Sequence, residues 1–191
     1  MSPCPMPLDP RSTAVLVVDV QQALCRGGCY EVFEAAALVA RINTLTQVAR
    51  AAGVPVVLVQ HEAVSGPMRR GEPGWELASD LSVQPSDWRL HKAASDCFQH
   101  TDLEQSLRAA GVRQLVVCGI QSDFCVDSTV RRALALGYEV CLVQDGHSTL
   151  DNGVLSAAQI SAHHNATLCE LSSYGPRARL VAAEALRFAA A

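Results

Sequence analysis

The sequence is poor in aromatic residues and in net charge, and it has no long uninterrupted apolar run. Aromatic residues make up 5% of the 191 residues, and the formal net charge at neutral pH is -4. Nucleic-acid-binding surfaces are typically basic with interleaved aromatic residues, so we expect no nucleic-acid partner. The longest apolar stretches, at 54–59 and 115–118, are far too short to span a bilayer, so we expect no membrane partner either.

The N-terminal residues also lack the features of a secretory signal. Residues 1–10 contain four prolines but no basic cluster followed by an apolar run. We therefore predict an extended tail at 1–12, a single domain at 13–191, and a soluble, cytoplasmic protein. A chain of this length is large enough to bury a substantial hydrophobic core.

The eight cysteines lack the pattern of a disulfide scaffold or of a zinc site. Cys118, Cys141 and Cys169 fall inside or at the end of predicted strands, where cysteine behaves as a small apolar residue. Cys25 and Cys29 share a glycine-containing loop, but no second Cys or His pair follows at the spacing of a zinc site. We therefore expect reduced thiols and no bound metal or other cofactor.

The sequence does contain a regular alternation of strand-like and helix-like segments. Apolar β-branched runs predict strands, and segments of helical periodicity that end at glycine predict helices. The predicted strands are 13–19, 54–60, 88–91, 114–119, 139–143 and 166–171. The predicted helices are 31–52, 101 or 102 to 110, 124–136, 152 or 153 to 164, and 176–190. This order predicts an α/β fold, a three-layer αβα domain with a six-stranded, mainly parallel sheet.

Three residues with reactive side chains lie at the carboxyl ends of predicted strands or in the turns that follow them. Ligands of parallel sheets bind beyond the carboxyl ends of the strands, where Asp19, Lys92 and Cys125 are placed. Cys125 lies in the turn before a predicted helix, whose N-terminus favours the thiolate form. A carboxylate can accept the thiol proton, and an ammonium group stabilises the thiolate.

Each of these residues also has a purely structural interpretation. Asp19 could cap a loop, Lys92 could be a surface lysine, and Cys125 could be a buried structural thiol. Because all three are expected at the same edge of one sheet, their combination favours a catalytic group.

The segments that hold these residues resemble the isochorismatase-like cysteine hydrolases. The similar segments are AVLVVDVQQAL at 14–24, the stretch 91–140 with its GIQSDFCV motif, and LVQDGHST at 142–149. The resemblance implies the strand order 3-2-1-4-5-6 and a catalytic triad that maps onto Asp19, Lys92 and Cys125.

The resemblance also implies a backbone geometry and a reaction. It implies a cis peptide between Ile120 and Gln121 and an oxyanion hole formed by the N–H groups of Gln121 and Cys125. The implied reaction is cleavage of an amide or carbamoyl C–N bond of a small molecule through a thioester, by a homodimer or homotetramer. Isochorismatases proper cleave a vinyl ether, which is an alternative, but the retained Cys125 favours acyl chemistry.

A non-hydrolytic protein is a further alternative. A reactive Cys125 could serve redox sensing, or the domain could bind a ligand without turnover. No obvious resolving cysteine neighbours Cys125, and neither role requires Asp19 and Lys92.

Residues near strand ends and on the long Gly- and Pro-rich loop 61–87 are candidate substrate contacts. A small-ligand site typically has a mostly apolar wall with a few polar groups, which suggests six residues: Leu24, Glu62, Trp75, Phe98, Gln121 and Phe124. For Trp75 and Phe98, packing in the core is an equal alternative, and Glu62 could be a solvated carboxylate.

Two histidines need a separate interpretation. Nicotinamidases, which are metal-binding relatives in the same superfamily, carry an Asp-x-His motif and further histidines after the second strand. Here no other histidine follows His61 until His91, so we interpret His61 as an ordinary loop or core imidazole. His147 is expected to support the site or an interface.

Overall fold

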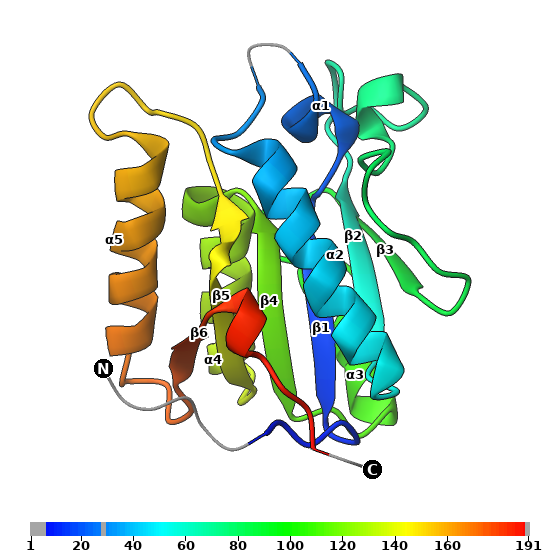
Figure 1. Cartoon of the computed structure of the whole chain (residues 1–191), viewed down its shortest axis with the longest axis vertical. Helices are drawn as coiled ribbons and strands as arrows, with labels where there is room; N and C mark the ends of the chain where they lie inside the picture. The colour runs from blue at the N-terminus through cyan, green and yellow to red at the C-terminus, as the bar shows by residue number, and fades with distance from the viewer. Residues whose placement is uncertain (1–6, 28–29, 190–191) are drawn as a thin grey trace.

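A six-stranded parallel sheet lies between two helical layers in the computed structural model, which describes residues 7–27 and 30–189 (Figure 1). The strands are β1 (Thr13–Val18), β2 (Val56–His61), β3 (Trp88–Lys92), β4 (Gln114–Ile120), β5 (Glu139–Ser148) and β6 (Ala178–Val181). Their order is β3-β2-β1-β4-β5-β6, and every neighbouring pair is parallel. The predicted fold class and strand order are confirmed.

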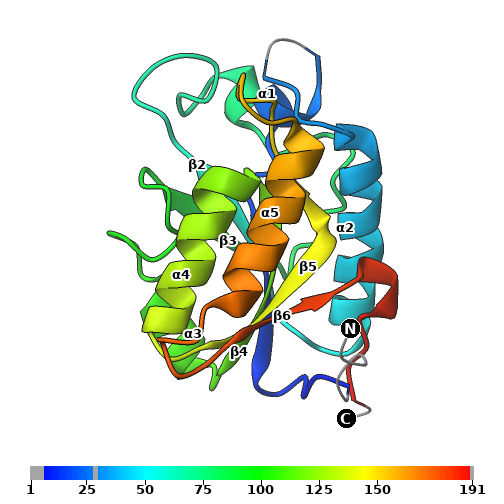
Figure 2. The same ribbon diagram turned by 90° about the vertical axis from the view of Figure 1, so that its left-hand side faces the viewer.

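Helices cover both faces of this sheet. They are α1 (Gln22–Cys25), α2 (Ala35–Ala51), α3 (Leu103–Ala109), α4 (Asp127–Ala135) and α5 (Ala157–Glu170). Three shorter turns are η1 (Pro73–Trp75), the π-helical η2 (Ser122–Val126) and η3 (Ala183–Ala185). Helix α2 and η3 lie on one face, and α3, α4 and α5 lie on the other (Figure 2).

Strand β1 shows why the sequence forms a sheet that is buried on both sides. All six of its residues are buried, and successive side chains point to opposite faces. Val15 and Val17 pack on the α2 side, and Leu16 packs on the side of α3 and α4. Full burial of one such aliphatic side chain contributes about 1.5–3 kcal/mol, which explains the uninterrupted apolar run.

Helix α2 begins later than the helical periodicity suggests. Residues 31–34 are outside the helix because their backbone contacts other segments: the Val32 N–H donates to Leu24 O and the Phe33 N–H donates to Thr149 O. Glu34 then has a φ of 50°, in the left-handed region, and the helix starts at the next residue.

The predictions for the C-terminal quarter were wrong in two places. The predicted strand 166–171 belongs largely to α5, where Leu168 packs into the core. The predicted helix 176–190 is replaced by β6, which pairs with β5, and by η3. Helix α5 also begins later than its predicted start at 152 or 153. Ser156 caps it through a reciprocal capping box with Gln159, in which each side chain bonds to the backbone of the other residue.

The segment before β1 contacts the end of the chain. Leu8 is buried, its N–H donates to Arg187 O at 3.0 Å, and it forms an isolated parallel bridge with Phe188. Residues 1–6 of the predicted tail lie outside the described residues. Across residues 7–27 and 30–189, no helix has both the length and the apolar character needed to cross a membrane.

Candidate active site

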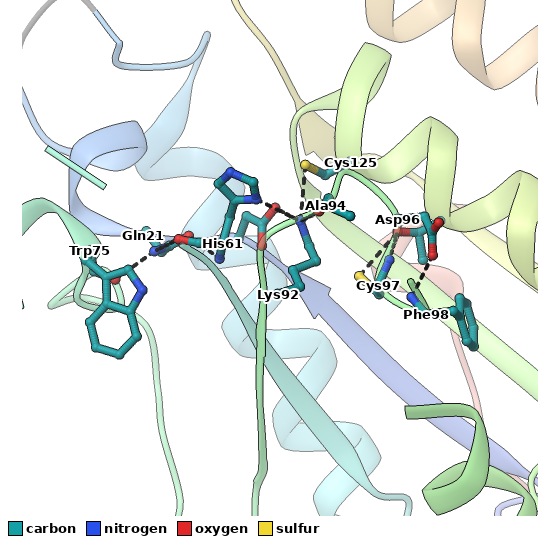
Figure 3. Close-up of polar contacts among 11 residues, drawn as sticks. Gln21, His61, Trp75, Lys92, Ala94, Asp96, Cys97, Phe98 and Cys125 are labelled. Carbon is teal, nitrogen blue, oxygen red and sulfur yellow. Dashed lines mark hydrogen bonds and ion pairs between the residues drawn. The ribbon is translucent and has the colours of Figure 1, made fainter. Parts of the chain in front are cut away.

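Four side chains meet at the carboxyl edge of the sheet, and Figure 3 labels three of them, His61, Lys92 and Cys125. Asp19 follows β1, His61 ends β2, Lys92 ends β3, and Cys125 lies in η2 after β4. The Lys92 Nζ lies 2.7 Å from Asp19 Oδ2 and 3.3 Å from Cys125 Sγ. The structure therefore brings the three residues that were singled out in the sequence into direct contact, and they are called the candidate triad below.

The ion pair in this triad is buried. Asp19 is 1% exposed and Lys92 is 3% exposed. The ammonium group has three N–H donors, and it has three acceptors in Asp19 Oδ2, Cys125 Sγ and the Ala94 carbonyl oxygen, the last at 3.1 Å. Asp19 Oδ1 makes no hydrogen bond of ordinary geometry within the described part of the chain, so this oxygen is available to accept a proton.

A glycine sets the spacing between β1 and β4 beneath the triad. Gly119 pairs with Val18 and has a φ of 123°, a region that L side chains rarely adopt. A Cβ atom at Gly119 would lie 2.1 Å from the Val18 carbonyl oxygen, which no side chain can tolerate. The close approach of the two strands, and with it the separation of Asp19 from Cys125, therefore requires glycine.

The turn that carries Cys125 closes on one carbonyl group. Gln121 O accepts hydrogen bonds from the N–H groups of Phe124, at 3.2 Å, and Val126, at 3.0 Å. The peptide bond between Ile120 and Gln121 is cis, at the position that the family resemblance implies.

The electrostatics of the triad correct one expectation from the sequence. Burial and the neighbouring Asp19 carboxylate raise the pKa of the Cys125 thiol well above its ordinary value, and Lys92 only partly offsets them. The helix N-terminus was expected to favour the thiolate, but burial outweighs it, so the thiol is protonated at rest. Burial lowers the pKa of Lys92, but Asp19 more than compensates and keeps the ammonium charged.

His61 belongs to this cluster, although the sequence interpretation placed it in an ordinary loop or in the core. Its Nδ1 lies 3.5 Å from Lys92 Nζ, and one ring nitrogen, one Asp19 oxygen and Cys125 Sγ all lie within 4.8 Å of one another. Burial and the Lys92 charge lower the pKa of His61, so its imidazole is neutral at physiological pH. One signal could have found it: His61 ends β2 directly beside Lys92 in the sheet register.

The same cluster contains donors that zinc accepts, but its centre already holds a cation. A carboxylate, an imidazole and a thiolate are ordinary zinc ligands. Here the Lys92 ammonium hydrogen-bonds to Asp19 and Cys125 and lies near His61, in the place that a metal ion would take. Of the cysteine pair considered in the sequence, Cys25 is buried at the end of α1, and Cys29 lies outside the described residues.

The six candidate substrate contacts separate into two groups. Leu24, Trp75 and Phe98 are buried, and the two rings have their own partners. The Trp75 ring packs on the His91 ring with 5.0 Å between the ring centroids, and the Phe98 ring stacks on the Tyr138 ring with 6.0 Å between the centroids. The other three, Glu62, Gln121 and Phe124, are at least partly accessible around the candidate triad.

Gln21 holds the end of β2 in place. Its Nε2 donates to the His61 carbonyl oxygen at 3.0 Å and to the Trp75 carbonyl oxygen at 2.7 Å, and its Oε1 accepts the His61 N–H at 2.8 Å (Figure 3). The Gln21 side chain is fully buried, and it links the segment that follows β1 to His61, which lies beside Lys92 in the sheet. This role of Gln21 was not predicted from the sequence.

A second buried network supports η2 from the other side. Ser122 Oγ lies 2.7 Å from His147 Nδ1 and 2.9 Å from Ser161 Oγ, and His147 Nε2 lies 2.9 Å from Asn165 Oδ1. Asn165 Oδ1 can only accept, so His147 carries its proton on Nε2 and accepts the Ser122 hydroxyl at Nδ1. Burial lowers the pKa of His147, which is consistent with a neutral ring in this network.

Comparison with known proteins identifies the domain. Residues 13–171 match the family model described as the isochorismatase domain. Streptothricin hydrolase from Streptomyces noursei is 42% identical over 139 residues, which are 72% of this chain but only 50% of that protein. The chain therefore matches about half the length of this relative.

Other relatives match over more of their length. Ureidoacrylate amidohydrolase RutB from Caulobacter vibrioides is 32% identical over 179 residues, covering 75% of this chain and 80% of the relative. Among solved structures, an isochorismatase from Pseudomonas putida superposes with a TM-score of 0.85 at 27% identity, covering 96% of this chain and 94% of the other. N-carbamoylsarcosine amidase from Thermoplasma acidophilum, at 23% identity, has a TM-score of 0.75 with coverage of 91% and 97%, and shares the fold.

Proposed function

Because this chain belongs to the isochorismatase family of hydrolases, we propose that it is a cysteine hydrolase that cleaves the C–N bond of a small amide or carbamoyl compound through a thioester. The observation that carries this proposal is the contact of one buried ammonium, that of Lys92, with both Asp19 and Cys125. The relationship to ureidoacrylate amidohydrolase RutB, an enzyme named for amide hydrolysis, supports C–N cleavage.

The acylation step follows from the protonation states of the triad. Asp19 Oδ1 accepts the Cys125 proton as the sulfur attacks the acyl carbon, and Lys92 stabilises the negative charge that passes between carboxylate and sulfur. Because the thiol is protonated at rest, proton transfer and attack are coupled. Asp19 then returns the proton to the leaving nitrogen, which departs as ammonia or an amine and leaves an acyl group on the sulfur.

The oxyanion of this step needs donors on the side of the acyl oxygen. We assign the N–H groups of Gln121 and Cys125 to that role, supported by the turn that closes on the Gln121 carbonyl. One such donor typically contributes about 2.7–4 kcal/mol to the stability of a tetrahedral intermediate. Water then adds to the thioester carbonyl, releases the carboxylic acid product and restores the Cys125 thiol.

The accessible residues at the triad suggest how a substrate is held. Phe124 is 54% exposed beside the nucleophile and offers an apolar surface, while Glu62 offers a carboxylate for a cationic or hydrogen-bond-donating group. The proposed substrate is therefore a small molecule with an apolar part.

The assembly and location of the enzyme are also proposals. Exposed apolar side chains at Phe124, Val154 and Leu155 support a homodimer or homotetramer, which light scattering after size-exclusion chromatography would test. The free thiols of Cys25, Cys97 and Cys118 support a reducing, cytoplasmic environment. No nucleic-acid partner is proposed, given the net charge of -4.

The decisive experiment is to trap the acyl-enzyme. The protein is incubated with a library of simple amides and carbamoyl compounds, and intact-mass and peptide-mass spectra are recorded. We expect a transient acyl adduct on Cys125 together with product, and neither in the Cys125→Ala variant. Product formation that continues in Cys125→Ala would refute the proposal.

A further inference from the structure

The buried hydrogen-bond network behind η2 has no task in the acylation step described above, although it ends on the turn that carries Cys125. Its members are Ser122, His147, Ser161 and Asn165. Ser122 is the first residue of η2 and is 0% exposed, and His147 is 5% exposed. A polar network buried so completely beside a reacting centre calls for an explanation, because burying polar groups is costly.

The direction of each hydrogen bond in this network is fixed by its acceptors. Asn165 Nδ2 donates to the Gln144 carbonyl oxygen at 2.9 Å, so Asn165 Oδ1 faces His147. His147 therefore donates from Nε2 and presents a lone pair at Nδ1, which accepts the Ser122 hydroxyl at 2.7 Å. The Ser122 oxygen in turn accepts the Ser161 hydroxyl at 2.9 Å. With its polar side chains paired in this way, the network forms a rigid connection between α5, β5 and η2.

Ser122 is not itself a nucleophile, although a serine, a histidine and an asparagine follow one another in the network. Its side chain is inaccessible to a substrate. Cys125 in the same turn is partly accessible, and its sulfur lies 3.3 Å from the Lys92 ammonium. The network therefore acts through the backbone that it holds and not on the substrate directly.

That backbone includes the Gln121 N–H, one of the two donors assigned to the oxyanion hole. His147 is attached to the chain on both sides of this group. Before it, Gly119 pairs with His147 in the register of β4 and β5. After it, Ser122 hydrogen-bonds to the His147 ring. The position of Gln121 relative to the sheet thus depends on one residue of β5.

We propose that Ser122 and His147 are positioning residues of the oxyanion hole, and that their hydrogen bond holds the start of η2 so that the Gln121 N–H points at the oxygen of the reacting acyl group. This inference rests on the proposed function. A donor stabilises an oxyanion when it is aligned before the reaction, and a displacement of about 1 Å can cost about 10²-fold in rate. The hydrogen bond should therefore affect reactions that pass through an oxyanion, and it should not affect other reactions of the same sulfur.

Two substitutions of His147 separate its two nitrogens. In His147→Asn the side-chain oxygen takes the place of Nδ1 and still accepts the Ser122 hydroxyl. In His147→Gln the longer amide reaches the place of Nε2, and Ser122 loses its acceptor. Ser122→Ala removes the donor of the same hydrogen bond.

Thr13→Val is the matched control for loss of a buried hydroxyl. Thr13 is 1% exposed, and its hydroxyl donates to the Asp9 carbonyl oxygen at 2.7 Å. It begins β1 and so lies at the opposite edge of the sheet from the candidate triad. Circular dichroism and thermal unfolding give the folded fraction of each variant, and all rates are expressed per folded protein.

The test compares two reactions of Cys125. p-Nitrophenyl acetate acylates the sulfur through a tetrahedral oxyanion, whereas iodoacetamide alkylates it by displacement at a saturated carbon and forms no oxyanion. Stopped-flow measurement of nitrophenolate release gives the acylation rate constant and the ester concentration at half-saturation. Peptide mass spectrometry gives the alkylation rate and identifies acetyl-Cys125.

We expect Ser122→Ala and His147→Gln each to lower the acylation rate constant by about 10²-fold, with little change in the half-saturating ester concentration or in the alkylation rate. The double variant should lose no more than either single variant, because all three lack the same hydrogen bond. His147→Asn should retain most of the native acylation rate, and Thr13→Val should behave as the native protein does.

Three results would overturn the positioning role. They are an unchanged acylation rate in folded Ser122→Ala, equal acylation rates in His147→Asn and His147→Gln, and losses of acylation and alkylation in the same proportion. If the native protein formed no acetyl-Cys125 and released nitrophenolate no faster than Cys125→Ala, the proposed function itself would fail.

Discussion

Two pairs of a carboxylate and a cation are largely buried in the part of the chain that the structure describes, and they differ in how completely the carboxylate is hydrogen-bonded. Asp87 pairs with Arg50 of α2 through two parallel contacts of 2.9 Å, and its Oδ2 also accepts the Gln84 N–H at 2.7 Å. Asp19 contacts Lys92 through one oxygen only, and its other oxygen makes no ordinary hydrogen bond among the described residues. Both carboxylates are nearly inaccessible.

The difference fits a structural role for the Asp87 pair and the chemical role that is proposed for the Asp19 pair. The Arg50 fork, which also donates to Ser82 O, fixes the end of the long loop where it enters β3. The Asp19 pair retains an acceptor beside a protonated thiol, and a residue whose hydrogen bonds are all satisfied could not take that proton. Incomplete pairing at a buried site is costly, so a functional use is its natural explanation.

The largest expected effect comes from replacing the reactive carboxylate. Asp19→Asn should reduce turnover by about 10²–10⁴-fold, because an amide cannot accept the thiol proton. Steady-state kinetics with an amide substrate or p-nitrophenyl acetate would measure this. Asp87→Asn is the matched control and should keep the turnover of each folded molecule; equal losses in both variants would remove the distinction between the pairs.

The next effect is on stability. Arg50→Met should destabilise the fold by about 3–5 kcal/mol, because the Asp87 carboxylate would remain buried without its partner. Urea denaturation followed by circular dichroism would measure the change. Arg179→Met removes an exposed ion pair with Glu139 and should leave the unfolding midpoint unchanged. An equally stable Arg50→Met protein would show that the satisfied pair contributes little to the fold.

A smaller effect concerns the thiol itself. Because Asp19 raises the pKa of Cys125 and Lys92 lowers it, Asp19→Asn should increase the thiolate fraction at neutral pH while it abolishes turnover. The rate of alkylation of Cys125 by iodoacetamide should rise about tenfold for each unit by which the pKa falls. Peptide mass spectrometry gives the rate at this cysteine, and slower alkylation would contradict the assigned electrostatics.

The smallest expected effect is on the pH dependence of stability, and it comes from His147, a buried group that is neutral and not part of an ion pair. Burial lowers the pKa of His147 in the folded state, so below a pH of about 6.5 the unfolded chain binds a proton that the folded chain does not. Stability should therefore be complete above this pH and fall below it. Urea midpoints across the acidic range should show this slope, and His147→Gln should make it shallower; an unchanged slope would show that His147 does not cause it.

The sequence predicted the fold and the triad because both depend on simple patterns. The first five strands begin within two residues of their predicted starts, and the residues that converge lie at the end of β3 and in the segments that follow β1 and β4. Parallel strands bring their carboxyl ends to one edge, so order along the chain was enough to predict the meeting of Asp19, Lys92 and Cys125.

The remaining features depend on contacts between distant segments. The alanine-rich C-terminus has high helix propensity, but pairing with β5 makes 178–181 an extended strand, so tertiary contacts override the local preference. His61 was interpreted as an ordinary imidazole because its environment is created by Lys92 and Gln21, which are remote in sequence. The hydrogen bonds to both oxygens of Asp87, and the lack of an ordinary hydrogen bond to Asp19 Oδ1 among the described residues, likewise depend on tertiary contacts that the sequence does not reveal.

The missing side chain at Gly119 lets β1 and β4 approach one another more closely than any other residue there would permit. A Cβ atom at this position would collide with main-chain atoms of Val18, so this constraint on the sheet lies in the backbone of the two strands. Repacking of apolar side chains on either face of the sheet could not relieve that collision, because the atoms of Val18 that it involves belong to the main chain.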